Sequence, residues 1–365
     1  MISSLALKNF TVFSDLKIDF SPGINVIIGE NGTGKTQLLK AAHALCVGTI
    51  RDGIQSNGNN FTESSIKRLS AEFTSRPELP DFILRLFMPF EQLRSNLVRH
   101  GSNEAVLSAK FSNDLFYKIN FDKDSTDFST HSKNPKFVKR EESTFIPTKE
   151  VLSIMLGFVS LFAEYELSFD QSYRDIMLVL DKPVLRAENM NKKSIWAIDT
   201  ITEIIGGKFL FHGGGRVTFK TKTSEMSASS VAEGYRKLGM LVRLLQTGAI
   251  IPGIKGPLLW DEPETNLNPK LLKLLAEILL ELSRQGQQII LATHDYVLLK
   301  WFDLLADSNE KDEVRYHALY KDSKTEGIRL ESKDDYRDLK KNALADTFDD
   351  LTVYYAKSQL RGASK

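Results

Sequence analysis

Ile24-Asn-Val-Ile-Ile-Gly-Glu-Asn-Gly-Thr-Gly-Lys-Thr36 is the stretch that decides the fold, because a short β-branched run leads directly into a glycine-rich loop. From Gly29 onward it matches the pattern G-x-x-x-x-G-K-[ST] of phosphate-binding loops. The glycines allow successive backbone N–H groups to surround phosphates, and a helix over Gln37–Val47 would point its positive end at them. We expect Lys35 to reach the β- and γ-phosphates of a nucleotide and the Thr36 hydroxyl to bind Mg²⁺. An ordinary glycine-rich turn is the less favoured interpretation, since chance produces this pattern in roughly one chain in a hundred of this length.

The residues before the loop alternate between apolar and less apolar side chains. This alternation, at Leu5 and Leu7 and again at Leu16, Ile18 and Phe20, predicts two antiparallel strands. The apolar run that ends at the loop is typical of a strand buried on both faces of a sheet.

Two further stretches place polar residues at the ends of apolar strands. Pro257-Leu-Leu-Trp-Asp-Glu-Pro-Glu264 ends in acids, and Gln288-Ile-Ile-Leu-Ala-Thr-His-Asp295 follows it after one predicted helix. Ligands of open α/β sheets collect at the carboxyl ends of the strands. We expect Asp261 to hold Mg²⁺ through a water and Glu262 to orient or deprotonate the water that attacks the γ-phosphate. His294 should lie next to that phosphate, although a lone histidine is more often structural and an acidic strand end is often a surface feature.

Composition limits the class of protein. The chain has 365 residues, which predicts one large α/β domain with an inserted lobe or two domains. Lys and Arg number 48 against 47 Asp and Glu, so no global field would draw the protein to DNA or to an anionic membrane. The single cysteine, Cys46, excludes an intramolecular disulfide. Val151–Ala163, the longest mostly apolar stretch, is too short to span a bilayer, and we expect a soluble, cytoplasmic chain that does not associate with membranes.

The middle of the chain is less regular. Between 51 and 140 we predict an exposed loop at Ser56–Asn60, a short strand at Phe82–Phe87 and a hairpin over Val106–Phe121. The polar stretch Asp122–Arg140 carries a small basic run, which we interpret as a solvated loop rather than a phosphate-contacting patch. That run consists of Lys133, Lys136, Lys139 and Arg140.

The region after 140 returns to regular structure. Glu142–Pro147 predicts a strand, and Thr148 is expected to cap a helix that begins at Lys149. The mostly helical pattern from Val151 to about Leu185 predicts a helical lobe. A second hairpin is expected to join Lys208–Phe211 to Arg216–Lys220.

The chain resembles the ABC-type ATPases in the order of its parts: a P-loop, a long insertion, an Asp-Glu strand and a strand ending in histidine. Within that superfamily it resembles the RecF/SMC/OLD-like branch, whose AAA-family members include prokaryotic defence proteins. Leu7-Lys-Asn-Phe-Thr-Val-Phe13 is similar to that branch's N-terminal strands, and Asp261-Glu-Pro-Glu-Thr-Asn-Leu-Asn-Pro269 to its Walker B motif and D-loop. The resemblance implies an α/β ABC-ATPase head, with a mixed sheet, N-terminal antiparallel strands and an inserted, largely helical lobe. The implied segments are an N-terminal core part (1–50), the inserted region (51–225), a C-terminal core part (226–310), and terminal strands with a helix or tail (311–365).

The resemblance also implies a signature segment, and Ser229–Leu238 is the candidate. It departs from the usual pattern because Ala232 stands where many relatives carry serine. Thr11 likewise stands where many relatives carry an arginine near the nucleotide, and Pro147–Glu150 occupies roughly the place of the transporter glutamine loop. In such ATPases the signature segment of one subunit closes the ATP site of another, which implies a homodimer or higher oligomer.

Motifs and resemblance together give a set of expected site residues, with ATP and Mg²⁺ as cofactors. Catalytic roles fall to Glu262, His294 and Lys35, and metal contacts to Thr36 and Asp261. The expected nucleotide contacts are Gly29, Glu30, Asn31, Gly32, Thr33, Gly34, Lys35, Thr36, Gln37, Ala232, Glu233, Gly234 and Asn268.

The biological role has to be argued separately from the fold. The first hypothesis is an ATP-driven switch that controls a separate effector protein, a nuclease or a toxin, in anti-phage defence. The chain after His294 is short and lacks the acidic clusters of a fused nuclease, while Ser332–Tyr355 is predicted to be a docking helix or tail. The alternative is a RecF/SMC-like repair ATPase that clamps DNA. A transporter subunit is the third hypothesis, which the long insertion and the unusual signature disfavour.

Overall fold

The computed structural model describes residues 1–56, 77–124, 128–133, 142–322 and 327–362. Its central element is a six-stranded sheet in the order β14-β13-β3-β12-β11-β7. All neighbouring pairs are parallel except β13 and β14, which are antiparallel. The strands are β3 (Ile24–Gly29), β7 (Thr144–Ile146), β11 (Leu258–Asp261), β12 (Ile289–Ala292), β13 (Val314–Asp322) and β14 (Gly327–Lys333).

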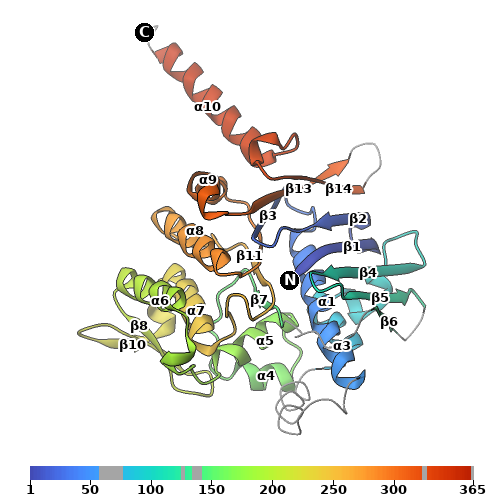
Figure 1. The fold of residues 1–365 in the computed structure, drawn as a ribbon, viewed down its shortest axis with the longest axis horizontal. Coiled ribbons are helices and arrows are strands. Elements are labelled where there is room, and N and C mark those ends of the chain that lie inside the picture. The colour runs from blue at the N-terminus through green and yellow to red at the C-terminus, as the bar shows by residue number, and fades with distance from the viewer. Residues whose placement is uncertain (57–76, 125–127, 134–141, 323–326, 363–365) are drawn as a thin grey trace.

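A five-stranded antiparallel sheet lies beside the central one, in the order β2-β1-β4-β5-β6 (Figure 1). Its strands are β1 (Ile2–Phe10), β2 (Phe13–Asp19), β4 (Glu104–Phe111), β5 (Phe116–Asp122) and β6 (Phe128–Lys133). Helix α1 (Lys35–Ser56) packs against both sheets. The predicted N-terminal strand pair and the 106–121 hairpin are therefore confirmed, and β1 pairs directly with β4 of the inserted region.

Alternate residues of the central parallel strands enter two separate cores. Val26 and Ile28 of β3 join the core formed with the C-terminal helices, whereas Ile27 joins the core around α1. Neighbouring side chains on a strand point to opposite faces, so a strand covered on both sides must be apolar at every position. This explains the unbroken β-branched run before the glycine-rich loop.

The helices cover both faces of the central sheet. The face to which Val26 and Ile28 point is covered by α7 (Glu233–Thr247), α8 (Pro269–Arg284) and α9 (Tyr296–Leu305). The inserted lobe contains α4 (Phe158–Glu164), α5 (Gln171–Leu180), α6 (Lys192–Ile205) and a small sheet of β8 (Lys208–Phe211), β9 (Val217–Lys220) and β10 (Glu225–Ser227). The predicted hairpin at 208–220 is confirmed.

Two sequence predictions in the inserted region are wrong. Phe82–Phe87 belongs to a helix, α3 (Leu79–Phe87), whose apolar residues recur at helical spacing and are buried. Thr148 does not cap a helix, because the next helix begins only at Phe158. The predicted helical run from 151 to 185 is therefore interrupted and contains only α4 and α5. Most of the predicted loop at Ser56–Asn60, and all of the basic run except Lys133, lie outside the described residues.

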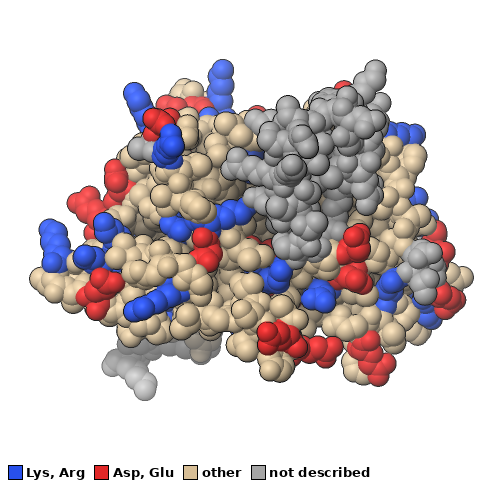
Figure 2. Space-filling view, turned by 90° about the horizontal axis from the view of Figure 1, so that it is seen from below, with Lys and Arg blue, Asp and Glu red and all other residues tan. Residues whose placement is uncertain are grey.

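Helix α10 (Ala343–Gly362) projects from the body at the C-terminal end (Figure 1). It begins later than the predicted 332–355 segment, the first part of which belongs to β14. Phe348 stacks on Tyr296 of α9 with ring centroids 4.1 Å apart. Among the described residues, no helix is both long and apolar enough to cross a membrane. On the face shown in Figure 2, acidic and basic side chains are interspersed.

Candidate active site

The glycine-rich loop joins the end of β3 to the start of α1 and fits only glycine at two positions. Gly29 has φ of 150°, and a Cβ there would lie 2.3 Å from the carbonyl oxygen of Leu319. Gly34 has φ of 89°, and a Cβ there would lie 2.6 Å from Cζ of Phe13. The strand–loop–helix arrangement expected of a P-loop is therefore present, and the β1–β2 turn packs against it.

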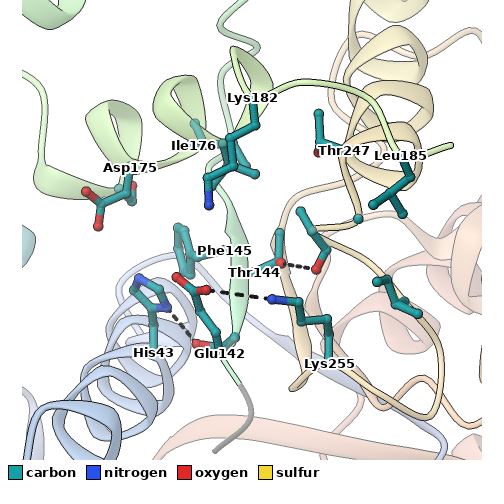
Figure 3. Close-up of a pocket in the computed structure, with 16 residues that line it drawn as sticks. His43, Glu142, Thr144, Phe145, Asp175, Ile176, Lys182, Leu185, Thr247 and Lys255 are labelled. Carbon is teal, nitrogen blue, oxygen red and sulfur yellow. Dashed lines mark hydrogen bonds and ion pairs between the residues drawn. The ribbon is translucent and has the colours of Figure 1, made fainter. Parts of the chain in front are cut away.

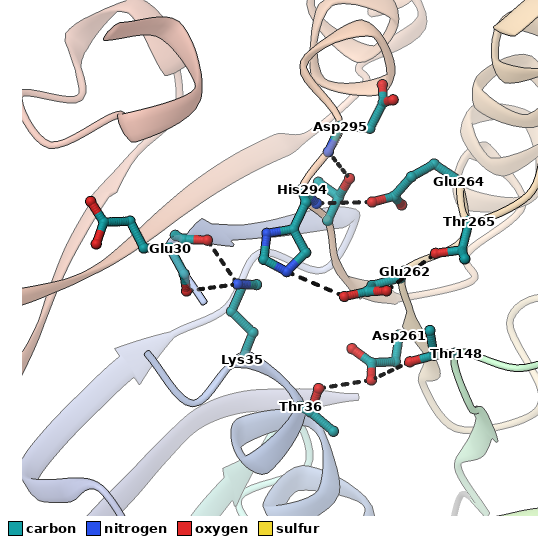
Figure 4. Close-up of polar contacts among 12 residues, drawn as sticks. Glu30, Lys35, Thr36, Thr148, Asp261, Glu262, Glu264, Thr265, His294 and Asp295 are labelled. Carbon is teal, nitrogen blue, oxygen red and sulfur yellow. Dashed lines mark hydrogen bonds and ion pairs between the residues drawn. The ribbon is translucent and has the colours of Figure 1, made fainter. Parts of the chain in front are cut away.

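Lys35 lies across this loop (Figure 4). Its Nζ donates hydrogen bonds to the carbonyl oxygens of Gly29 at 2.7 Å and Glu30 at 3.0 Å. Burial lowers the pKa of Lys35, and the nearby carboxylates of Glu262 and Asp261 oppose that shift. The ammonium group is thus held at the mouth of the loop, facing the acidic end of β11.

Asp261 ends β11 and receives two hydroxyl groups. Its Oδ2 accepts hydrogen bonds from Thr36 Oγ1 and from Thr148 Oγ1, both at 2.8 Å. Burial raises the pKa of Asp261, and the two hydrogen bonds oppose that shift. Carboxylate and hydroxyl oxygens suit Mg²⁺, which prefers hard oxygen ligands, so this cluster fits the metal. Sequence reasoning missed Thr148 because its position before an apolar run resembled a helix cap.

Glu262 and His294 meet beside this cluster. His294 Nε2 lies 3.2 Å from Glu262 Oε1, and Thr265 Oγ1 donates to Glu262 Oε2 at 3.2 Å. The backbone N–H of His294 donates to Glu264 Oε1 at 2.8 Å, which fixes the end of β12. Burial lowers the pKa of His294, as does the charge of Lys35. Because β11 and β12 are parallel neighbours, the predicted acid and histidine are brought together at one sheet edge, as expected.

The candidate signature segment, Ser229–Leu238, includes the start of α7 and packs on the turn that follows Glu262. The Glu233 carboxylate accepts a hydrogen bond from Asn266 Nδ2 at 2.7 Å. A Cβ at Gly234 would lie 2.7 Å from the carbonyl oxygen of Asn266. Ala232 is the residue before the helix, without a side-chain cap, whereas Asn268 caps α8 by accepting from Lys270 N at 3.0 Å.

Pro147–Glu150, the segment at the expected place of the glutamine loop, contacts both the end of β11 and helix α7. Thr148 bonds to Asp261, and the buried Glu150 forms an ion pair with Arg236 of α7 at 2.8 Å. The segment therefore connects the end of β11 to α7.

A separate cavity of about 230 Å³ lies beside α1 (Figure 3). Residues of α1, β7, α5 and the end of α7 line it, His43 of α1 among them, and Lys182 and Lys255 join the lining from the segments that follow α5 and α7. His43 Nδ1 lies 2.8 Å from Ser143 Oγ at its wall. None of the predicted site residues lines this cavity, so it is not part of the P-loop site.

Comparison with known families decides the class of protein. A family model described as "AAA domain" matches residues 4–203, more than half of the 365-residue chain. The chain belongs to this AAA-domain family. A second family model, described as "AAA domain, putative AbiEii toxin, Type IV TA system", matches residues 208–300 of the AAA-domain protein.

Curated relatives resemble the AAA-domain protein over short stretches. It is 44% identical over 46 residues to the DNA replication and repair protein RecF of Lactococcus lactis subsp. cremoris (strain MG1363). The matched stretch makes up 13% of this chain and 13% of that one. It is 34% identical over 94 residues to the DNA repair protein RecN of Rickettsia bellii (strain RML369-C), 25% of this chain and 16% of that one. The matches thus span less than a fifth of the length of these relatives.

A solved structure resembles nearly the whole chain. The SMC head bound to the C-winged helix domain of ScpA superposes with a TM-score of 0.54 at 13% identity, covering 91% of this chain and 97% of that chain. At this identity the likeness shows the fold alone. The AAA-domain protein therefore has the fold of an ABC-type ATPase head, and the family matches place it with the P-loop ATPases of the RecF/SMC branch.

Proposed function

We propose that this AAA-domain protein binds ATP with Mg²⁺ at its P-loop and hydrolyses it to ADP and phosphate. The observation that carries the proposal is the pairing of Glu262 with His294 at 3.2 Å, beside the Thr36–Asp261 pair at 2.8 Å. This places a carboxylate that can take a proton next to oxygen atoms that can hold a metal. Phosphoryl transfer needs little more from a protein than such positioning and charge stabilisation.

Each residue has a distinct role in this proposal. The backbone N–H groups of residues 29–37 and the Lys35 ammonium hold the phosphates of ATP. Thr36 and Asp261 would hold Mg²⁺, which when bound neutralises charge on the phosphate oxygens.

Glu262 orients the attacking water and accepts its proton as the oxygen attacks the γ-phosphorus and the bond to ADP breaks. Burial lowers the pKa of His294 below its ordinary value, so the imidazole is neutral at pH 7 and can donate a hydrogen bond from Nε2 to Glu262.

We further propose that the site is completed by a second copy of the chain. The start of α7 presents Ala232, Glu233 and Gly234, and the N-terminal cap of α8 presents Asn268, as contacts to ATP held by the other subunit. The likeness of the fold to an SMC head supports this arrangement. The test is Glu262→Gln on a sizing column with ATP, where a dimer is expected and a persistent monomer would rule out the shared site.

For the biological role we propose a switch in which ATP-driven closure controls a separate effector, a nuclease or a toxin, in anti-phage defence. The family description that names the AbiEii toxin and a type IV toxin–antitoxin system supports this role. The experiment is to express the chain with its neighbouring genes and to identify co-purifying proteins with and without ATP. A stoichiometric nuclease or toxin is expected, and recovery of the homodimer alone would count against the switch.

The local similarity to RecF and RecN favours a second candidate, a repair ATPase that clamps DNA. Such a clamp needs basic residues gathered along one path, and the interspersed charges in Figure 2 give it no support on that face. Affinity for DNA that falls steeply with salt concentration would favour the clamp.

A further inference from the structure

Lys237 is a buried lysine that the proposed reaction does not yet use. It lies in the second turn of α7 and is 1% exposed, whereas lysines are almost never fully buried unless they are paired. Its Nζ donates hydrogen bonds to the backbone carbonyl oxygens of Glu262 at 2.8 Å and Thr265 at 3.1 Å. Burial lowers the pKa of Lys237 to about 8, and the surrounding carboxylates, with Glu264 and Glu233 foremost, oppose the shift.

The turn that Lys237 contacts carries the carboxylate assigned to the attacking water. Glu262 has φ of 48°, a left-handed conformation that residues other than glycine rarely adopt. Its amide donates to the carbonyl of Ala292 at 2.9 Å, and its carbonyl accepts from Thr265 N at 3.2 Å as well as from Lys237. Thr265 in turn donates its hydroxyl to the Glu262 carboxylate. Lys237 therefore holds both the backbone that aims Glu262 and the residue that contacts its carboxylate.

An ammonium group suits this place for a chemical reason. It has three donors and no acceptor, so it can serve two carbonyl oxygens at once. A methionine would fill a similar volume but would donate nothing, and two half-buried carbonyls would lose a donor.

Because Lys237 lies on α7, its hydrogen bonds also link this helix to the 262–265 turn. The same helix begins with Glu233 and Gly234, which pack against Asn266 in the turn after Glu262. A displacement of α7 therefore reaches the catalytic turn through Lys237 and through these packed residues.

We propose that Lys237 is a positioning residue for ATP hydrolysis: it fixes the 262–265 turn so that the Glu262 carboxylate meets the attacking water, and it makes this geometry depend on the placement of α7. The proposal rests on the ATPase function and on the shared site proposed above. It assigns Lys237 no contact with ATP, so its loss should alter turnover rather than binding.

The experiment compares Lys237→Met and Lys237→Arg with a matched control, Arg243→Met. Arg243 also lies on α7 and donates to two backbone carbonyls, those of Leu180 at 2.8 Å and Lys182 at 2.9 Å, at the other end of the helix. Lys237→Met should lower kcat by roughly ten- to a hundred-fold with KM for ATP essentially unchanged, since a small misplacement of a catalytic group has effects of this size. Lys237→Arg should recover most of that loss, and Arg243→Met should turn over like the wild type.

The pH dependence of kcat distinguishes a positioning role from a merely structural one, because a merely structural role would not change it. Wild-type kcat should fall as pH rises through about 8, where Lys237 loses its proton. Lys237→Arg should lack this alkaline limb because arginine stays charged. The charged groups that face Lys237 are the carboxylates of Glu233, Asp261, Glu262 and Glu264. They are unchanged in this variant, so it separates the lysine's titration from theirs.

The outcomes separate this inference from the proposed function. A wild-type chain that hydrolyses no ATP would defeat the ATPase proposal itself. An active wild type whose Lys237→Met variant behaves like Arg243→Met would defeat only the positioning role. If Lys237→Met does not fold, the pH profile of Lys237→Arg still tests the inference. A kcat that falls above a pH of about 8 in Lys237→Arg as it does in the wild type would overturn it.

Discussion

Replacing Gly34 by alanine tests whether the P-loop has the packed geometry described above. A Cβ at Gly34 would lie 2.6 Å from Cζ of Phe13 and 2.7 Å from Cγ2 of Val12, at φ of 89°. Gly101 provides the control, because it has φ of 83° and nothing within 4 Å of the added carbon. The two substitutions therefore share the conformational strain and differ in the steric clash.

The expected magnitudes follow from that difference. Alanine at positive φ costs about 1–2 kcal/mol, offset by about 0.4–1 kcal/mol because the unfolded chain loses freedom. Gly101→Ala should therefore destabilise the fold by no more than about 1.6 kcal/mol. Gly34→Ala adds an overpacking cost of about 1–3 kcal/mol. If the loop shifts away from Phe13 to relieve the clash, its N–H groups move and ATP affinity should fall by roughly 5- to 150-fold.

The assays are thermal unfolding without nucleotide and calorimetric titration with ATP and Mg²⁺. Gly101→Ala should bind ATP like the wild type, while Gly34→Ala should bind it weakly. A Gly34→Ala variant that binds ATP as tightly as Gly101→Ala and is equally stable would contradict the close packing of the loop against the β1–β2 turn.

Three further predictions concern the site and the core. Glu262→Gln should lower kcat by roughly 10²–10⁴-fold, measured as phosphate release, because it removes the base but keeps the shape. Glu277→Gln, on the exposed side of α8, should leave kcat intact, and equal rates in the two variants would refute the role of Glu262. Thr36→Val should weaken the dependence of ATP binding on Mg²⁺, because it removes the hydroxyl that bonds Asp261 at 2.8 Å; an unchanged Mg²⁺ titration would contradict this. His317 is fully buried with its pKa lowered to about 3, so the folded state disfavours its protonation. Unfolding free energy should therefore fall by on the order of 1 kcal/mol per pH unit as pH drops from about 6.5 towards 3, and urea titrations of His317→Gln should show a weaker slope.

The parts of the site that the sequence predicted are those whose chemistry dictates a local pattern. Gly29 and Gly34 are needed because no Cβ fits. Asp261 is the last residue of β11 and His294 comes two residues after β12, so their common sheet edge could be expected. Thr148 and Lys237 could not be found in this way. Their partners lie 113 and 25–28 residues away, and nothing local distinguishes a threonine before a turn from a helix cap.

The fold was predictable to a similar extent. The hairpins could be predicted because their strands are adjacent in sequence, whereas the pairing of β1 with β4 spans about a hundred residues and leaves no local signal. Helix α3 was mistaken for a strand because Phe82–Phe87 alone is a short apolar run. Extending the window to Leu79 shows apolar residues at helical spacing, with Pro80 in the first turn, which would have favoured the helix.

The measurement that tests the central claim most directly is single-turnover phosphate release from ATP by the purified chain, with Mg²⁺ and with EDTA, alongside Glu262→Gln. The account predicts release by the wild type that requires Mg²⁺, and a Glu262→Gln variant that binds ATP but releases phosphate far more slowly. Phosphate release that persists in EDTA, or that is equally fast without the Glu262 carboxylate, would contradict the assignment of this site to ATP hydrolysis.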